Sequence, residues 1–225
     1  MIAREYNKII SEIESYKFDN SIINSYTSRH IFTSNMSWSI PNNDTIELLC
    51  DFIEKGNVIS IGSGLGLWEK LIELKSKIKN YNINIITTDD LSWYPDKKLI
   101  IYKNIHNFKL CLKAESDKKN TNIKKLWKMP INLNHQDAIK KYGHYDTLLL
   151  SWPPYDDNMA YETIKLFKGY KIIYIGEPIG GCCGNDEFFD ILEKEWMLIK
   201  EIKIPQWEGI HDSIFVYERI SSLIK

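Results

Sequence analysis

Two short stretches hold most of the residues in this chain that could do chemistry. Residues 58–66 read V-I-S-I-G-S-G-L-G, an apolar strand that runs into a glycine-rich turn. Residues 146–155 read D-T-L-L-L-S-W-P-P-Y, a second apolar strand that ends in Ser-Trp-Pro-Pro-Tyr. Open α/β sheets bind ligands outside the carboxyl ends of their strands. We therefore expect both stretches to border one binding site.

The glycine-rich turn is the candidate site for a cofactor. Without a Cβ atom, a glycine lets the backbone approach a ligand closely, and the helix that follows presents free N–H groups to an anion such as a carboxylate. A dinucleotide site favours G-x-G-x-x-G, but here Leu67 stands where the third glycine would fall. The spacing therefore disfavours a nicotinamide cofactor, and a plain tight turn remains the alternative. The candidate cofactor-binding residues of the turn are Gly62, Ser63, Gly64 and Gly66.

Three acids could bind the remainder of a nucleoside-like cofactor. Asp89 and Asp90 follow a strand predicted over residues 82–88. A carboxylate at such a strand end accepts hydrogen bonds from ribose hydroxyls, and we expect only one of the two to do so. Asp137, in the run H-Q-D-A, could reach the amino group of the base. An acid that stabilises the start of a helix is an equally good explanation for Asp137.

The Ser-Trp-Pro-Pro-Tyr run is the candidate substrate side. Pro153 and Pro154 leave carbonyl groups without the usual partner N–H, free to accept from an amine. Tyr155 can stack on a planar substrate. Ser151 and Trp152, at the strand end itself, are candidate cofactor-binding residues. A rigid strand terminator with an aromatic at the rim is the structural alternative.

Further candidates lie near other strand ends. Glu177 follows a strand predicted over residues 171–176 and could bind an amine or act as a base. His211 precedes the last strand, and because histidine titrates near neutral pH it is a second candidate base. Asp212 beside it is a candidate substrate ligand. Trp38 could cover the pocket. With Ser151 and Tyr155, Glu177 and His211 complete the candidate catalytic set.

The periodicity of the chain predicts the elements that must position these residues. Asp44 and Glu47 are spaced as a capping box for one helix. The predicted helices cover 3–17, 44–53, 67–78, 135–142, about 157–167 and 185–193. The predicted strands cover 57–61, 82–88, 129–133, 146–152, 171–176, 196–204 and 213–219.

Length and composition favour one globular domain. A chain of 225 residues with 44% hydrophobic side chains can bury a sizeable core. We predict a single domain over 1–225, with an N-terminal helical cap over 1–56. No apolar run is long enough to cross a bilayer, and no signal core stands at the N-terminus, so we expect a cytoplasmic protein. The four cysteines do not have the spacing of a metal site, so we predict none.

The charge of the chain is unevenly distributed. Between Lys97 and Lys128 there are ten lysines and two acids, about +8, although the whole chain carries −1. We predict an irregular Lys-rich insert over 91–128. Such a segment could attract nucleic acid, but a solvated insert is favoured because the rest of the chain, at about −9, repels a polyanion. The sequence does not predict the oligomeric state.

With the glycine loop, the strand-end acids and Pro-Pro-Tyr in this order, the chain resembles the class I methyltransferases that depend on S-adenosylmethionine (SAM). The resemblance implies a Rossmann-like α/β fold: a mostly parallel seven-stranded sheet with an antiparallel C-terminal edge strand and helices on both faces. It implies SAM as cofactor. Residues 37–219 are similar to a little-characterised methyltransferase-like family with a W-P-P-Y motif. The matching segments are Ser37–Pro41, Ile61–Trp68, Leu148–Tyr155, Tyr174–Glu177, Gly180–Phe189 and Ile204–Asp212.

Two departures from the class I pattern bear on function. An acid usually stands two residues before the first glycine, where this chain has Ser60. Enzymes that methylate amino groups of nucleic acids place Asp, Asn or Ser directly before Pro-Pro, where this chain has Trp152. We therefore expect methyl transfer to a small molecule or a protein. The alternatives are an inactive binding module with the same fold and a nucleic-acid methyltransferase.

Overall fold

The computed structural model describes residues 1–16, 22–92, 99–104, 109–114 and 124–220. A seven-stranded sheet forms its centre, with strand order β6-β2-β1-β7-β8-β10-β9. All strand pairs are parallel except the two that involve β10, which runs antiparallel to both β8 and β9. The strands are β1 (Gly56–Ile61), β2 (Ile83–Asp89), β6 (Ile131–Asn132), β7 (Thr147–Ser151), β8 (Lys171–Gly176), β9 (Trp196–Lys203) and β10 (Ser213–Arg219).

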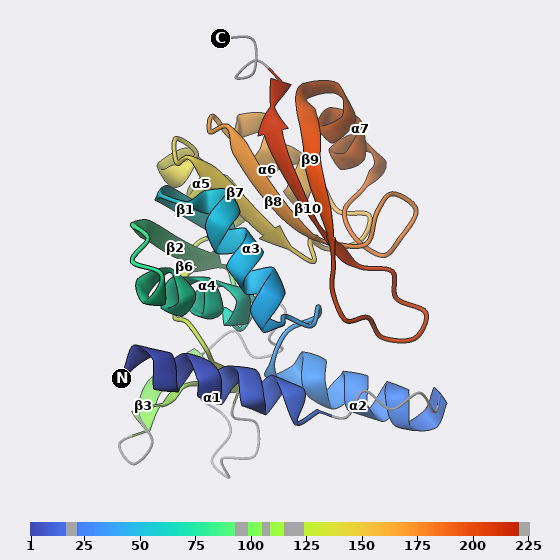
Figure 1. The fold of residues 1–225 in the computed structure, drawn as a ribbon. Coiled ribbons are helices and arrows are strands. Elements are labelled where there is room, and N and C mark those ends of the chain that lie inside the picture. Colours follow the sequence, from blue (N-terminus) through green and yellow to red (C-terminus); the bar gives the residue numbers. More distant parts are fainter. Residues whose placement is uncertain (17–21, 93–98, 105–108, 115–123, 221–225) are drawn as a thin grey trace.

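Helices cover both faces of this sheet (Figure 1). The central strands are mainly apolar because both of their faces are buried. Val58 and Leu149 face one core together with the first four helices, while Ile59 and Leu148 face the other core with the last three. The helices are α1 (Ile2–Glu14), α2 (Ile22–Asn35), α3 (Asn43–Ile53), α4 (Leu67–Ile78), α5 (His135–Tyr142), α6 (Met159–Leu166) and α7 (Asp186–Glu195).

The predicted α/β fold class is confirmed. The sheet is mostly parallel, its C-terminal part contains the antiparallel strand, and helices lie on both faces. This is a Rossmann-like, doubly wound arrangement. β10 lies one position inside the sheet, and β9 forms the outer edge.

The prediction of an irregular insert over 91–128 is wrong for the described part of that segment. β3 (Leu99–Asn104), β4 (Lys109–Ala114) and β5 (Lys124–Leu126) form a separate antiparallel sheet. Its strands are held by cross-strand pairing, which leaves no helical periodicity to detect. In β4 (K-L-C-L-K-A) leucines at every second position are typical of such a strand, but the high lysine content of the whole segment favoured the prediction of an irregular insert. The other residues of the insert, Lys118 and Lys119 among them, lie outside the described residues.

The start of α3 also differs from the prediction. The capping box is formed by Asn42 and Thr45, not by Asp44 and Glu47. The Thr45 N–H donates to Asn42 Oδ1 at 2.9 Å, and the Asn42 N–H donates to Thr45 Oγ1 at 3.2 Å. Asn is as good an N-cap as Asp, so the sequence offers two possible starts for this helix, and the helix begins at the earlier one.

Figure 1 shows α1 and α2 along the lower side of the molecule, below α3 and α4.

Candidate functional site

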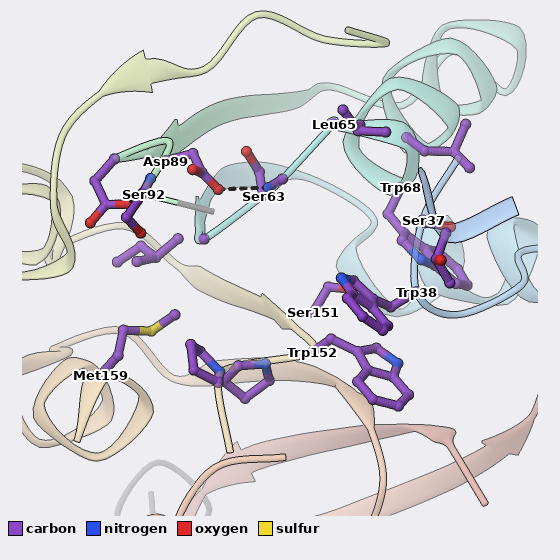
Figure 2. A pocket seen from close by; sticks show the side chains of 18 of the residues that line it. Ser37, Trp38, Ser63, Leu65, Trp68, Asp89, Ser92, Ser151, Trp152 and Met159 are labelled. Carbon is purple, nitrogen blue, oxygen red and sulfur yellow. Dashed lines mark hydrogen bonds between the residues drawn. The ribbon is translucent and has the colours of Figure 1, made fainter. Parts of the chain in front are cut away.

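One large cleft lies at the carboxyl ends of the central strands. Its volume is about 990 Å³, at the upper end of the range for small-molecule sites. The glycine turn after β1, the acids after β2 and the Ser-Trp-Pro-Pro-Tyr run after β7 all line it. The two stretches that the sequence singled out are therefore brought together, because β1 and β7 are parallel neighbours. Figure 2 shows Asp89 and Ser92 at one end of the cleft, and Trp68, Ser37 and Trp38 at the other.

The glycine turn is fixed by the strand beside it. The N–H groups of Gly62 and Ser63 donate to the Thr88 carbonyl at 3.0 and 3.1 Å. Gly64 has φ +56°, and a Cβ atom added there would meet nothing within 4 Å, so its open side faces the cleft that it lines. Gly66 has φ +74°, and a Cβ atom would come 2.8 Å from the Lys128 carbonyl. The missing side chain of Gly64 therefore leaves room for a ligand, whereas that of Gly66 allows the backbone of Lys128 to pack closely against the turn.

A buried pair of side chains joins the two elements on either side of the turn. Ser60, at the end of β1, donates from Oγ to Oε1 of Glu69 in α4 at 2.5 Å. Both residues are 1% exposed. Burial raises the pKa of Glu69 to about 7, although the hydrogen bond from Ser60 and the charge of Lys128 oppose the rise. A buried carboxyl group is therefore present beside Ser60, where the class I pattern would have an acid. It comes from Glu69 of α4 and not from the strand itself.

The two acids after β2 have different surroundings. Asp89 is 4% exposed, and its carboxylate accepts from the N–H groups of Gly64 and Leu91, each at 2.7 Å. Asp90 is exposed and accepts from the Ser92 N–H at 2.9 Å. Both line the cleft. Asp137 is exposed in the first turn of α5, where its N–H donates to the side chain of the N-cap residue Asn134. It does not line the cleft within the described part of the chain.

The residues after β7 form a strained and supported edge. Trp152 has φ +50°, in the left-handed region that a large L residue seldom adopts. Strain of this kind persists only where the surroundings hold it. The Trp152 indole N–H donates to Ser39 Oγ at 2.5 Å and to Asp212 Oδ2 at 3.3 Å, and its ring stacks on Trp38 with centroids 5.5 Å apart.

Asp212 therefore holds the Trp152 indole through a hydrogen bond, and it does not line the cleft within the described structure. It is 1% exposed, and burial raises its pKa, against the hydrogen bonds from Ser39 and Trp152. Trp38 is 53% exposed and does line the cleft. Tyr155, 69% exposed, stands at the rim.

The expectation that the Pro-Pro carbonyls are free is wrong. The Gly184 N–H donates to the carbonyls of both Pro153 and Pro154, at 3.3 and 3.1 Å. These bonds and a short bridge between Tyr155 and Gly184 attach the motif to the loop before α7. The two prolines still line the cleft with their rings. Their arrangement is fixed by a contact between residues about thirty positions apart, which no local pattern reveals.

Glu177 and His211 do not line the cleft in the part of the chain that the structure describes. Glu177 is 4% exposed and accepts from the N–H groups of Cys182 and His211, each at 2.8 Å. Burial alone would raise the pKa of Glu177, but these backbone donors keep it below its usual value. The His211 side chain is exposed. Glu177 therefore joins the loop before α7 to the loop before β10.

Several cleft residues were not predicted from the sequence. Arg29 and His30 of α2, Met159 of α6 and Cys182 all line the cleft. No local pattern marks Arg29, because it stands in a polar stretch. The buried Glu69 could have been singled out from the sequence, because it falls on the apolar face of an amphipathic helix, where an acid is unusual.

In the described residues, no three His, Cys, Asp or Glu side chains are grouped as a metal site. No described helix is long and apolar enough to cross a membrane.

Comparisons with known proteins gave likenesses of structure only. No family model matches the chain, and no curated protein sequence matches it. One similar structure is the 1,6-didemethyltoxoflavin-N1-methyltransferase of Burkholderia thailandensis with bound 1,6-didemethyltoxoflavin and S-adenosylhomocysteine (SAH). It is 8% identical, with a TM-score of 0.46, over 93% of this chain and 90% of that one.

Two further similar structures are described as candidate methyltransferases. The protein yhhF from Escherichia coli is 14% identical, with a TM-score of 0.38, over 79% of this chain and 85% of its own. A candidate RNA methyltransferase from Pyrococcus horikoshii, PH1948, is 10% identical, with a TM-score of 0.33, over 96% and 99%. At these scores the likenesses carry no weight for function, and the fold assignment rests on the strand order itself.

Proposed function

We propose that this chain is a SAM-dependent methyltransferase whose acceptor is a small molecule or a protein. The observation that carries the proposal is the meeting of three strand ends at one cleft: the open Gly64, the acid pair Asp89-Asp90 and the Ser151–Tyr155 run. The resemblance of these motifs to class I methyltransferases supports the same function, as does the finer likeness to the W-P-P-Y family.

The residues present fit such a cofactor. The Oγ atom of Ser63 and the indole N–H of Trp68 are buried without a hydrogen-bond partner in the described structure, and both residues line the cleft. Buried polar groups without a partner are uncommon and are expected to bind something. The first turn of α4 has no side-chain cap, so its N–H groups and positive end are also available.

We assign roles to the candidate residues as follows. Gly62, Ser63 and Gly64 form the cradle, and Gly66 allows the turn to pack against Lys128. Asp90 accepts from the ribose hydroxyls while Asp89 holds the turn. Ser151 and Trp152 separate the cofactor from the acceptor. Trp38, Pro153, Pro154 and Tyr155 form the wall against which a planar acceptor would lie. Glu177, His211 and Asp212 hold this wall in position, and Asp137 takes part only if α5 moves toward the cleft.

The chemistry needs little more than positioning. SAM, when bound, supplies an activated methyl group, and this chain has to place an acceptor atom in line with it. Correct placement of two reactants contributes up to about 7–11 kcal/mol in well-oriented systems. The stacked Trp38 and Trp152 rings and the fixed Pro-Pro run provide a defined apolar surface for that purpose. A base is required only if the acceptor must lose a proton.

Thermal unfolding with SAM, SAH and NAD tests the proposal. A ligand at 100 times its dissociation constant adds about 2.7 kcal/mol of stability. We expect stabilisation by SAM and SAH and none by NAD. Stabilisation by NAD alone would contradict the proposal. Transfer of labelled methyl groups to cell extract, with and without nuclease, then separates an active enzyme from an inactive binding module and shows whether the acceptor is a nucleic acid.

A further inference from the structure

We propose that the tryptophan end of the cleft contains a carboxylate-binding subsite formed by Arg29 of α2 and Trp68 of α4. This subsite rests on the proposed function, and it gives a ligand-binding role to Arg29, which lies in no sequence motif, and to Trp68, which had none among the candidate residues. The carboxylate could belong to the aminoacyl tail of the cofactor or to the acceptor, and the experiment below distinguishes these sources.

Two buried hydrogen-bond donors lie without an acceptor at this end. The Nε atom of Arg29 and the Nε1 atom of Trp68 are both inaccessible to solvent and unpartnered among the described residues. Both residues line the cleft. A buried donor left without a partner costs about 1–3 kcal/mol. Two such donors, from two different helices that line the same cleft, therefore indicate that a ligand supplies the missing acceptor atoms in the working protein.

Within the described part of the chain the guanidinium of Arg29 has no ion pair, and its one charge contact there is with the face of the Trp38 ring at 5.8 Å. Trp38 in turn stacks on Trp152 at the end of β7. The guanidinium is thereby joined through two rings to the Ser-Trp-Pro-Pro-Tyr run. A partly buried guanidinium without a carboxylate partner suits an anionic ligand, which it binds with two parallel N–H groups.

The cleft is polarised along its length. Asp89 lies at one end of the cleft, and Trp68 lies at the other end with Ser37 and Trp38 (Figure 2). Arg29 belongs to this second end because its guanidinium lies over the Trp38 ring. The carboxylates of the acid pair thus lie at one end, and the unpartnered donors of Arg29 and Trp68 lie at the other. A ligand that fits this polarity carries hydroxyl groups at one end and a carboxylate at the other.

The experiment measures binding by calorimetry to the full chain and two variants, Arg29→Met and Trp68→Phe. Arg29→Met removes the guanidinium with its charge and all of its donors, Trp68→Phe removes the single indole donor, and both keep an apolar side chain of similar length or shape. Arg4→Met is the control for the charge, since Arg4 is exposed on α1. Trp196→Phe is the control for the indole, because Trp196 is 3% exposed with an unpartnered Nε1 and lies outside the cleft.

The probes are SAH and 5′-methylthioadenosine, which lacks the aminoacyl tail. If the carboxylate belongs to the cofactor, each variant weakens SAH binding about tenfold or more and leaves methylthioadenosine unchanged. The other pair of probes is indole-3-acetate and its amide. If the carboxylate belongs to the acceptor, SAH binding is unchanged, and the preference of the unmodified protein for the acid over the amide is lost in the variants.

Unchanged binding of both SAH and the acid in Arg29→Met and Trp68→Phe would overturn the subsite. This outcome is distinct from failure of the proposed function, which would show as no SAH binding by the unmodified protein. The acid and amide probes need no cofactor, so the subsite stays testable in that case. A loss of SAH binding as large in Trp196→Phe as in Trp68→Phe would also contradict the inference, because it would reflect general destabilisation.

Discussion

Oδ2 of Asp89 accepts a hydrogen bond of 2.7 Å from the backbone N–H of Gly64. This bond joins the acid at the end of β2 to the open position of the glycine turn after β1. The second carboxylate oxygen accepts from Leu91, so both oxygens of Asp89 are already used by the backbone. Asp89 therefore shapes the site, and its exposed neighbour Asp90 is left to meet a ligand.

The acid pair gives the first prediction. Asp90→Ala should weaken SAH binding by about 1.5–3 kcal/mol, the value of hydrogen bonds to a charged group, with little change in unfolding free energy. Asp89→Ala should lower the unfolding free energy by about 1–3 kcal/mol, because it leaves buried backbone N–H groups unpaired. Calorimetry and urea denaturation of both variants measure these effects. Equal loss of affinity with no loss of stability in the two variants would contradict this division of roles.

Gly64→Val should abolish SAH binding in a protein that still folds. The side chain would project into the cleft, where a Cβ atom meets nothing, and φ +56° costs an L residue about 1–2 kcal/mol. Gly209→Val is the matched control, because Gly209 has φ +73° with equally open space and lies outside the cleft. Both variants should lose similar stability, and only Gly64→Val should lose binding. Normal SAH affinity in a folded Gly64→Val protein would exclude the turn as the cofactor site.

The buried Glu69 gives a prediction on pH. Its pKa is about 7 in the folded protein against an ordinary 4.5, so the folded state binds the proton more tightly than the unfolded chain does. Stability from this proton is fully present below about pH 4.5 and is lost as pH rises through 7, by roughly 3 kcal/mol at most. Glu69→Gln keeps an acceptor for Ser60 and cannot titrate.

Chemical denaturation between pH 4.5 and 8 measures this difference. The unfolding free energy of the unmodified protein should fall relative to that of Glu69→Gln as the pH rises. Parallel pH profiles for the two proteins would show that the pKa of Glu69 is the same in the folded and unfolded states, and would contradict the prediction. The comparison cancels other titrating groups, except the nearby Lys128 and Asp89, whose charges act on Glu69.

The Lys-rich segment should bind nucleic acid only weakly. Lys128 already pairs with Glu73 at 2.5 Å, and the rest of the chain is acidic. We expect sequence-independent binding at low salt that disappears near physiological ionic strength, with a log–log slope of about −0.9 per phosphate contacted on duplex DNA. Titrations of RNA and DNA at several salt concentrations measure it. Tight binding at physiological salt, abolished by changing Lys118, Lys119, Lys124 and Lys125 to Glu, would favour a nucleic-acid acceptor instead.

The sequence by itself determined the central sheet and the place of the cleft. The strands around Ile59, Leu148 and Ile173 are apolar runs, because parallel strands are buried on both faces, and such runs are visible locally. The glycine turn and the Pro-Pro run mark their carboxyl ends without reference to the rest of the fold. Parallel strands place those ends at one edge, so the meeting of the two motifs could be predicted.

Only the tertiary structure decided which side chains serve the cleft and which support it. Asp89, Asp212 and Glu177 were predicted to contact ligands, but each binds backbone or side-chain donors from a distant part of the chain. Arg29 reaches the cleft from a helix that carries no motif. The direction of a side chain at a strand end depends on which loop packs against it, and that contact joins residues far apart in sequence. Local patterns place a residue near a site, whereas burial and long-range hydrogen bonds determine what it does there.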